Sequence, residues 1–181
     1  MGLPPRLVAE RGIARSFQMP QLYLSLTVLE NLLLALAIRG GKAGDFWAPL
    51  ARNSRVEEAE GVLEQFGLEE YRDQKASQLP EGARKLLDIA LSFARRPRML
   101  LMDEPTSGVS VKDKFRIMDT LVRVLKESGV TTVFVEHDME VVEKYAERVL
   151  VFHEGRVLAD GPSSAVLADA TVRRAVLGEG A

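Results

Sequence analysis

The sequence predicts an α/β fold in which a parallel sheet is combined with an α-helical subdomain. Two apolar runs that end in acidic residues support this prediction, at residues 99–104 (Met-Leu-Leu-Met-Asp-Glu) and 131–138 (Thr-Thr-Val-Phe-Val-Glu-His-Asp). Such runs are typical of buried parallel strands, whose carboxyl ends bind ligands in open α/β sheets. Residues 28–93 show helical patterns. After them strand and helix patterns alternate, which indicates crossover helices between parallel strands.

Composition excludes several classes of function. The chain has 181 residues, enough to bury a sizeable core, and the absence of cysteine excludes disulfides, thiolate metal sites and cysteine nucleophiles. The formal net charge of -2 offers no basic field, so we expect no nucleic acid partner. The longest apolar tract, residues 22–38, is interrupted by polar side chains, so we expect no direct membrane insertion.

The N-terminal segment is expected to combine a short helix with a loop. Residues 6–16 fit a short helix interrupted at Gly12. Pro20 disfavours the helical conformation for the residue before it, so Gln18 is expected in a loop. A lone glutamine in a loop is usually solvated, which is the simplest interpretation of Gln18.

The following helices are marked by capping signals. In a capping box, Ser or Thr at the helix start is followed three residues later by Glu, and this pattern occurs at Thr27 and Ser54. We expect the first helix to end near Gly40 and the second at Gly67. A further amphipathic helix should begin near Pro80 or Glu81.

The C-terminal half is predicted to alternate between strands and helices. Residues 111–126 carry an apolar stripe at helical spacing, and a hairpin turn is expected at residues 153–156. The other expected elements are a strand at 130–135, a short helix at 139–145, strands at 149–152 and 157–159, and two short terminal helices.

The acidic strand ends are the candidate site. Asp103 and Glu104 follow the first strand directly, and two carboxylates at such an edge suggest metal and water chemistry. The alternative is that they open a turn before Pro105. The second strand ends in Glu-His-Asp around His137, and two such ends with complementary chemistry favour the functional interpretation. The alternative for His137 is a satisfied histidine at a strand end.

These motifs resemble those of ABC transporter ATPases, in the same order and over essentially the whole chain. Residues 99–104 look like a Walker B strand with its following glutamate, 135–138 like the strand end with the switch histidine, and 17–18 like the Q-loop. The branched-chain amino acid transporter branch is the most similar, through residues 15–18, 26–31 and 135–139.

The resemblance implies a role for each candidate residue. Asp103 would hold Mg²⁺, usually through water, while the metal bridges the terminal phosphates of ATP. Glu104 would polarise the attacking water as general base. His137 would hydrogen-bond the γ-phosphate or hold that water in line. Gln18 would touch Mg²⁺ or water and report the nucleotide state to the membrane subunit.

The signature motif of the family is only partly present. Residues 79–90 fall where the family has Leu-Ser-Gly-Gly-Gln opening a helix, whose backbone N–H groups approach a phosphate. Leu79 and Gly82 match, and Ser110 stands at the D-loop position where the family has an acid or amide. The departures are Pro80, Glu81 and Ala83.

The sequence contains no Gly-x-x-x-x-Gly-Lys-[Ser/Thr] phosphate loop. The nearest run, residues 40–42, has Leu36 in place of the first glycine and Ala43 in place of Ser or Thr. In the family this loop and its strand precede the Q-loop, so we expect the chain to correspond to the C-terminal two-thirds of a nucleotide-binding domain. The missing strand would lie between residues 130–135 and 149–152. Either the sheet closes up, or another polypeptide fills the gap, or the chain is marginally stable.

The resemblance therefore implies a partial P-loop NTPase domain. We expect a Q-loop entry segment at residues 1–18, a helical subdomain ending in the signature helix at 19–95, and the C-terminal part of a RecA-like α/β core at 96–181. The implied function is the ATP-binding and ATP-hydrolysing subunit of an importer for branched-chain amino acids, with ATP and Mg²⁺ as cofactors and no activity alone.

The implied partners are transmembrane permease subunits and a second ABC ATPase subunit, and the implied location is cytoplasmic, peripheral at the inner face of the cell membrane. One alternative is a non-catalytic interaction subunit that pairs with a complete ABC ATPase. Another is a soluble ABC ATPase of repair or translation, which the absence of a long coiled-coil or tandem-domain insertion disfavours.

Overall fold

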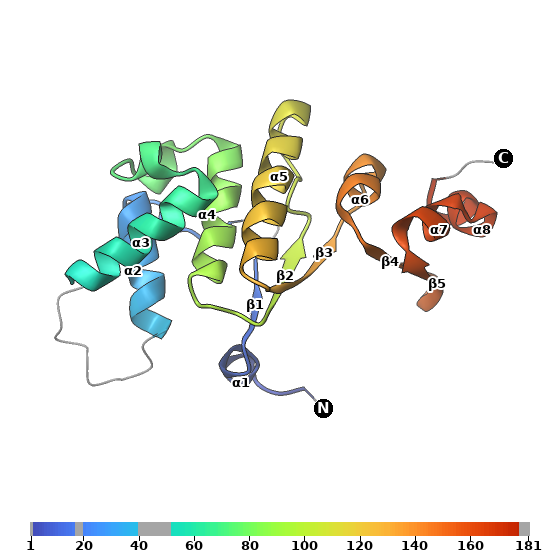
Figure 1. Cartoon of the computed structure of the whole chain (residues 1–181), viewed down its shortest axis with the longest axis horizontal. Coiled ribbons are helices and arrows are strands. Elements are labelled where there is room, and N and C mark those ends of the chain that lie inside the picture. The colour runs from blue at the N-terminus through green and yellow to red at the C-terminus, as the bar shows by residue number, and fades with distance from the viewer. Residues whose placement is uncertain (1, 17–19, 40–51, 178–181) are drawn as a thin grey trace. The chain divides into compact units, whose positions relative to one another are not determined.

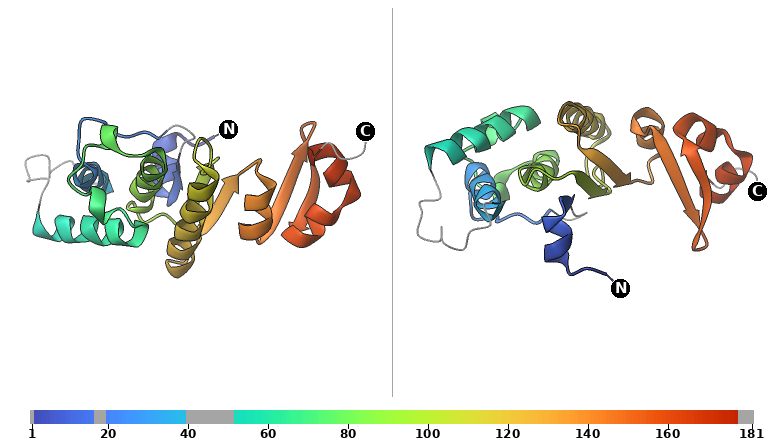
Figure 2. Two further views of the ribbon diagram at one scale, coloured as in Figure 1. Left: turned by 90° about the horizontal axis from the view of Figure 1, so that it is seen from above. Right: turned by 60° about the horizontal axis from the view of Figure 1, so that its bottom comes forward.

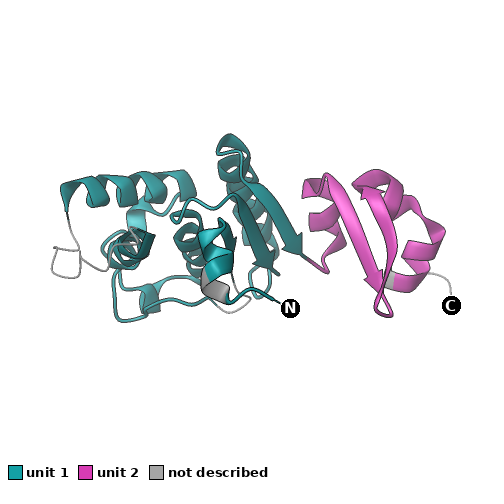
Figure 3. Cartoon of the chain, turned by 90° about the horizontal axis from the view of Figure 1, so that it is seen from below, with its two compact units in different colours: residues 1–135 teal, residues 136–181 magenta. Residues whose placement is uncertain are grey.

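The structure is a computed structural model that describes residues 2–16, 20–39 and 52–177. The chain divides into two compact units, Met1–Val135 and Glu136–Ala181, which Figure 3 shows in separate colours. This boundary does not coincide with the segment boundaries expected at residues 18 and 95, which stay predictions. The expected loop around Gln18 and the run at residues 40–42 lie outside the described residues.

The first unit contains a parallel sheet of three strands in the order β1-β2-β3 (Figure 1). The strands are β1 (Ile13–Arg15), β2 (Met99–Asp103) and β3 (Thr131–Val135). Ile13 and Thr131 both pair with Met99, so β2 is the central strand. The expected parallel arrangement is confirmed for β2 and β3.

The strand β1 lies where the sequence suggested the second part of an interrupted helix, so that expectation was wrong. The helix α1 (Pro5–Glu10) ends before Gly12, which has a φ of 81°. The carbonyl of Gly12 then accepts hydrogen bonds from the backbone N–H of Arg98 at 2.7 Å and of Met99 at 3.1 Å. Glycine adopts this left-handed conformation without a steric cost, so the chain turns there and continues along β2.

Two helices lie on one side of the sheet, as Figure 2 shows: α4 (Glu81–Phe93) and α5 (Val111–Glu127). Both helices begin where the sequence predicted. Leu100 and Met102 of β2 are buried, together with the α5 residues Ile117 and Leu121. This layer is the main hydrophobic core of the first unit.

The remaining helices of the first unit are α2 (Val28–Arg39) and α3 (Asn53–Phe66), followed by the 3-10 turns η2 (Glu69–Tyr71) and η3 (Ala76–Gln78). The capping box at Thr27 is confirmed, because its N–H donates to the Glu30 carboxylate at 2.7 Å and its hydroxyl accepts from the Glu30 N–H at 3.1 Å. The capping box at Ser54 was wrong. The N-cap of helix α3 is Arg52, two residues before Ser54, and it makes no side-chain cap hydrogen bond.

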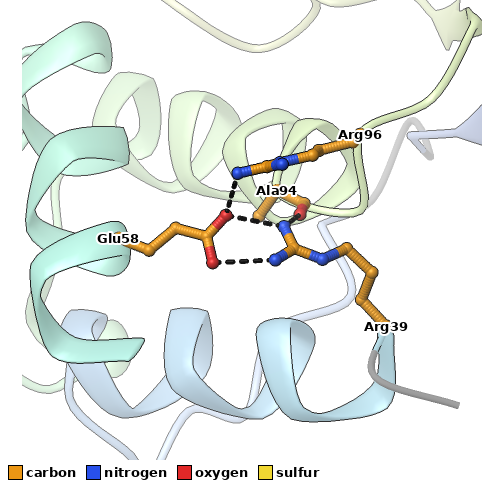
Figure 4. A network of polar contacts seen from close by, with 4 residues as sticks. All are labelled: Arg39, Glu58, Ala94 and Arg96. Carbon is orange, nitrogen blue, oxygen red and sulfur yellow. Dashed lines mark hydrogen bonds and ion pairs between the residues drawn. The ribbon is translucent and has the colours of Figure 1, made fainter. Parts of the chain in front are cut away.

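An ion-pair network joins α2 and α3 to the turn after α4 (Figure 4). Arg39 donates two hydrogen bonds to the carboxylate of Glu58, at 2.8 and 2.7 Å, and one to the carbonyl of Ala94 at 2.9 Å. Arg96 donates to the same carboxylate at 2.8 Å. These arginines, Arg39 foremost, lower the pKa of Glu58 below its ordinary value.

The second unit contains an antiparallel hairpin of β4 (Arg148–His153) and β5 (Arg156–Pro162). Its turn at Glu154 and Gly155 confirms the expected hairpin, and both residues have positive φ. The helix α6 (Met139–Tyr145) also lies where it was predicted. The other elements are the helices α7 (Ser163–Ala168) and α8 (Ala170–Val172) and the π-helical turn η4 (Arg173–Leu177).

Within the described residues, one sheet contains β1, β2 and β3 and another contains β4 and β5. Within the described part of the chain, none of the helices has the length and apolarity that a membrane span requires.

Candidate functional site

Asp103 is the last residue of β2, where the sequence placed it, and its carboxylate pairs with a cation. Arg15, at the end of the adjacent strand β1, donates a hydrogen bond to Asp103 Oδ2 at 2.9 Å. The side chain of Asp103 is 36% exposed and that of Arg15 is 56% exposed. The carboxylate is therefore partly neutralised but still open to solvent and to a ligand. Sequence reasoning did not identify Arg15 as a site residue.

Glu104 turns the chain sharply at the carboxyl edge of the sheet. Its φ of 46° is left-handed, which is uncommon for a residue other than glycine and costs about 1 kcal/mol or more. The turn is held from both sides, because the Glu104 N–H donates to the carbonyl of Val135 at 2.9 Å and its carbonyl accepts from the Ser107 N–H at 3.1 Å. The half-buried Glu104 thus follows Asp103 at a fixed position beside the end of β3.

Buried charges on α4 support this turn and its surroundings. Lys85, which is 4% exposed, donates from Nζ to the Glu104 carbonyl at 3.4 Å. Asp88, which is 6% exposed, accepts a hydrogen bond from the backbone N–H of Gln21 at 2.9 Å. Sequence reasoning missed both residues. The available signal was a charged side chain on the apolar face of an amphipathic helix, where burial requires a polar partner.

The signature turn, residues 79–82 at the start of α4, contacts the segment that follows Glu104 in the same chain. Leu79 and Gly82 are both buried. A Cβ at Gly82 would meet Ile117 Cδ1 at 3.5 Å, an ordinary contact, so packing alone does not demand a glycine there. Glu81, in the first turn of α4, lies against Gly108, where a Cβ would be only 2.6 Å from Glu81 Oε1. A carboxylate therefore stands at the helix end where an anion would otherwise be favoured.

Ser110 serves as the N-cap of α5. Its hydroxyl accepts a hydrogen bond from the Asp113 N–H at 3.2 Å and donates to the Asp113 carboxylate at 2.6 Å. The expected contact of Ser110 with a second subunit stays a prediction, and any such contact would compete with this cap.

His137 belongs to the second unit, where it follows β3 and is exposed. The next residue, Asp138, caps α6 by accepting hydrogen bonds from the N–H groups of Glu140 at 3.1 Å and Val141 at 3.3 Å. Asp138 therefore has a structural role. The catalytic role expected for His137 stays a prediction.

The two carboxylates at the end of β2 suit Mg²⁺, which needs few protein ligands, better than a metal ion whose ligands all come from the protein. Asp103 and Glu104 supply carboxylate oxygens, and Mg²⁺ in nucleotide sites commonly takes one or two carboxylates and completes its shell with water and phosphate. Within residues 2–16, 20–39 and 52–177, no group of three or more His, Cys, Asp and Glu could hold a metal ion. A cage of the zinc or calcium type is thus absent from the described part.

Comparisons with known sequences agree with this architecture. The model of the ABC transporter family matches residues 6–107. The high-affinity branched-chain amino acid transport ATP-binding protein BraF of Pseudomonas aeruginosa is 33% identical over 98% of this chain and 72% of its own length. A probable branched-chain amino acid transport ATP-binding protein of Archaeoglobus fulgidus is 34% identical over 97% of this chain and 69% of its own.

Solved structures show the same fold. The ADP conformation of an ATP-binding cassette of an ABC transporter superposes with a TM-score of 0.81 and 32% identity, covering 97% of this chain and 72% of that one. A dimeric cassette in a post-hydrolysis state, bound to ADP and Pi, gives a TM-score of 0.71 and 27% identity, covering 89% and 68%. This chain belongs to the ABC transporter family of ATP-binding cassette proteins.

Proposed function

We propose that this chain is an ATP-binding and ATP-hydrolysing subunit of an importer for branched-chain amino acids, and that it is inactive alone. The observation that carries the proposal is the strand end of β2, which presents Asp103 and then Glu104 in a fixed left-handed turn. The relatives at 33% and 34% identity, which are described as branched-chain amino acid transport ATP-binding proteins, support the choice of substrate.

In this proposal each site residue has a defined task. Bound Mg²⁺ would neutralise charge on the terminal phosphates of ATP. Asp103 would hold the ion through water, and its pairing with Arg15 would have to loosen to do so. Glu104 would accept a proton from the attacking water as general base. His137 would donate a hydrogen bond to the γ-phosphate, and Gln18 would contact the metal or its water.

The proposal also includes the assembly of this chain with a second ABC ATPase subunit and with permease subunits. Leu79, Gly82 and Ser110 would lie toward the nucleotide of a second ABC ATPase subunit, and transmembrane permease subunits would hold the pair at the inner face of the membrane. Glu81 weakens this chain's contribution, since its carboxylate repels a phosphate at the start of α4. The proposal that these 181 residues are inactive by themselves is supported by their lack of a phosphate-loop motif.

Calorimetry of the purified chain with ATP and Mg²⁺ tests the proposal of inactivity. We expect no detectable binding up to about 1 mM nucleotide, because backbone N–H groups that cradle phosphates are missing. Saturable micromolar binding that Asp103→Asn weakens would overturn it. The importer role is tested separately, by co-purification of the chain with the membrane subunits of the P. aeruginosa system.

A second candidate function is a non-catalytic subunit that pairs with a complete ABC ATPase. The position of Glu81 against Gly108 favours it, because the signature turn then offers a carboxylate in place of a phosphate-binding surface. The discriminating measurement is the ATPase turnover of BraF with increasing amounts of this chain. Lower turnover that Glu81→Ala restores supports the non-catalytic role, whereas unchanged turnover at excess chain argues against pairing.

A further inference from the structure

Two opposite charges are buried one turn apart on α4. Lys85 is 4% exposed and Asp88 is 6% exposed, although these residue types are rarely buried unless they are paired. Residues three positions apart are neighbours on a helix, so the two charges attract each other and each lowers the cost of burying the other. Since apolar residues of similar volume often stabilise a buried site equally well, stability alone does not explain these charges.

The two side chains hold different segments of the first unit. Lys85 donates from Nζ to the carbonyl of Glu104 at 3.4 Å, at the left-handed turn that follows β2. Asp88 accepts at Oδ1 from the backbone N–H of Gln21 at 2.9 Å. The first contact joins residues 19 positions apart in the sequence and the second joins residues 67 positions apart. Helix α4 therefore connects both segments.

The contact of Lys85 adds to the backbone hydrogen bonds that hold the turn. The Glu104 carbonyl accepts from Lys85 and also from the Ser107 N–H at 3.1 Å, so both of its lone pairs have a donor. The Glu104 N–H donates to the carbonyl of Val135 at 2.9 Å. A left-handed residue other than glycine persists only where its surroundings hold it firmly, so loss of the lysine donor should loosen the turn.

We propose that these two charges are positioning residues, through which α4 couples the segment at Gln21 to the turn at Glu104. The importance of this coupling rests on the proposed function, in which Glu104 is the general base and must keep a fixed place beside the attacking water. Gln21 comes three residues after Gln18, so a movement of that segment would act on Asp88. A displaced Asp88 raises the cost of keeping Lys85 buried, and the turn then loses a donor.

Amide exchange of the full chain, followed residue by residue by NMR without nucleotide, tests the coupling. Asp88→Ala should speed exchange at Gln21 by about tenfold or more, because its N–H loses the acceptor. Exchange at Glu104 and Ser107 should also become faster. Asp88→Asn keeps an acceptor oxygen, so exchange at Gln21 should stay slow. All rates are compared with those of α5 amides, which report a general loss of stability.

Substitutions of the lysine test the other end of the coupling. Lys85→Met keeps a buried aliphatic stem without the donor, and should speed exchange at Glu104 and Ser107 and shift the carbonyl ¹³C resonance of Glu104. Lys85→Arg keeps a cationic donor and should restore both signals. Lys112→Met removes an exposed lysine of α5 and is the matched control, which should change neither.

A double variant separates positioning from stability. Lys85→Met combined with Asp88→Leu replaces both buried charges with apolar side chains, so the urea midpoint should stay close to that of the wild type. Exchange at Gln21 and Glu104 should nevertheless remain fast, because neither backbone contact is restored.

Two results would overturn the proposal. Exchange at Glu104 and Ser107 that stays slow in Asp88→Ala would show that α4 does not connect the two segments. Faster exchange that extends equally to the α5 amides would show that the two charges only stabilise the fold. These measurements need no ATP, so a failure of the coupling is distinguishable from a failure of the proposed ATPase role, which is tested with nucleotide and with membrane subunits.

Discussion

At the scale of single residues, Gly108 meets two constraints together. Its φ of 80° favours glycine, and a Cβ there would overlap the carboxylate of Glu81 at 2.6 Å. Gly129 meets only the first, since its φ is 66° but a Cβ at that position would have no heavy atom within 4 Å. Substitutions at Gly108 and Gly129 can therefore distinguish the cost of backbone strain, which both share, from the cost of disturbing the contact with Glu81, which only Gly108 has.

We predict that Gly108→Ala lowers the free energy of unfolding more than Gly129→Ala does. Left-handed strain costs about 1–2 kcal/mol at either position, and Gly108→Ala must in addition displace the flexible carboxylate end of Glu81, which adds a small cost. Urea unfolding followed by circular dichroism measures both losses. In a Glu81→Ala background, Gly108→Ala and Gly129→Ala should lower the free energy of unfolding equally. A difference that persists there would show that the contact between residue 108 and Glu81 has no energetic role.

The carboxylate of Glu58 makes stability depend on pH. We predict that Glu58→Gln lowers the free energy of unfolding by about 1–2 kcal/mol at pH 7, because the hydrogen bonds from Arg39 and Arg96 lose their charge assistance. The pKa of Glu58 is lowered in the folded chain, first by the hydrogen bond from Arg39. Its contribution is therefore complete above the ordinary pKa of 4.5 and is lost as the pH falls through the lower folded value.

Urea titrations of the wild type and Glu58→Gln at several pH values check this dependence. The gap between the two curves should be constant above about pH 5 and should shrink below it. Glu57→Gln, one residue earlier on α3 and exposed, is the control and should lower stability very little. A gap that widens in acid would contradict the assigned cause.

At the scale of elements, two similar sequence signals give different structures. Thr27 and Ser54 both precede a glutamate by three residues, yet only Thr27 forms the reciprocal hydrogen bonds. We predict that Thr27→Ala lowers the free energy of unfolding by about 1 kcal/mol. Ser54→Ala should change it by less than about 0.5 kcal/mol, since Ser54 caps nothing. Equal losses, measured in urea, would contradict the assignment of the caps.

The elements that the sequence predicted correctly are those with a long apolar period. The stripes of α4 and α5 and the apolar run of β2 each repeat one signal over a whole element. The three residues of β1 are too short to carry such a signal. They form a strand because β2 supplies the hydrogen bonds, which is a tertiary effect.

The same distinction explains the site. Asp103 and Glu104 were found because they end an apolar run, and the run fixes their place at the sheet edge. Arg15 and Lys85 were missed because their contacts with Asp103 and Glu104 join residues 88 and 19 positions apart in the sequence. Nothing in the local pattern of one sequence indicates such pairs.

At the scale of the whole molecule, the two units differ in the core that supports them. The first unit buries apolar residues from α2, α3, α4, α5 and β2. The second unit buries fewer apolar residues: the cluster of Val151, Val166 and Val172, against which Val149 and Ala159 pack, and the α6 residues Val141 and Val142. On their exposed sides the hairpin strands carry Leu150 and Phe152, which are 50% and 68% exposed.

This difference predicts that the chain opens in two steps. A unit of fewer than about 50 residues buries too little apolar area for much stability of its own. Native-state hydrogen exchange should therefore give amides of β4 and β5 a lower free energy of opening than those of α4 and α5, by about 2 kcal/mol or more. Peptide-level mass spectrometry across a urea series measures both sets. A single opening free energy shared by the two sets would mean that the chain opens in one cooperative step and would contradict this prediction.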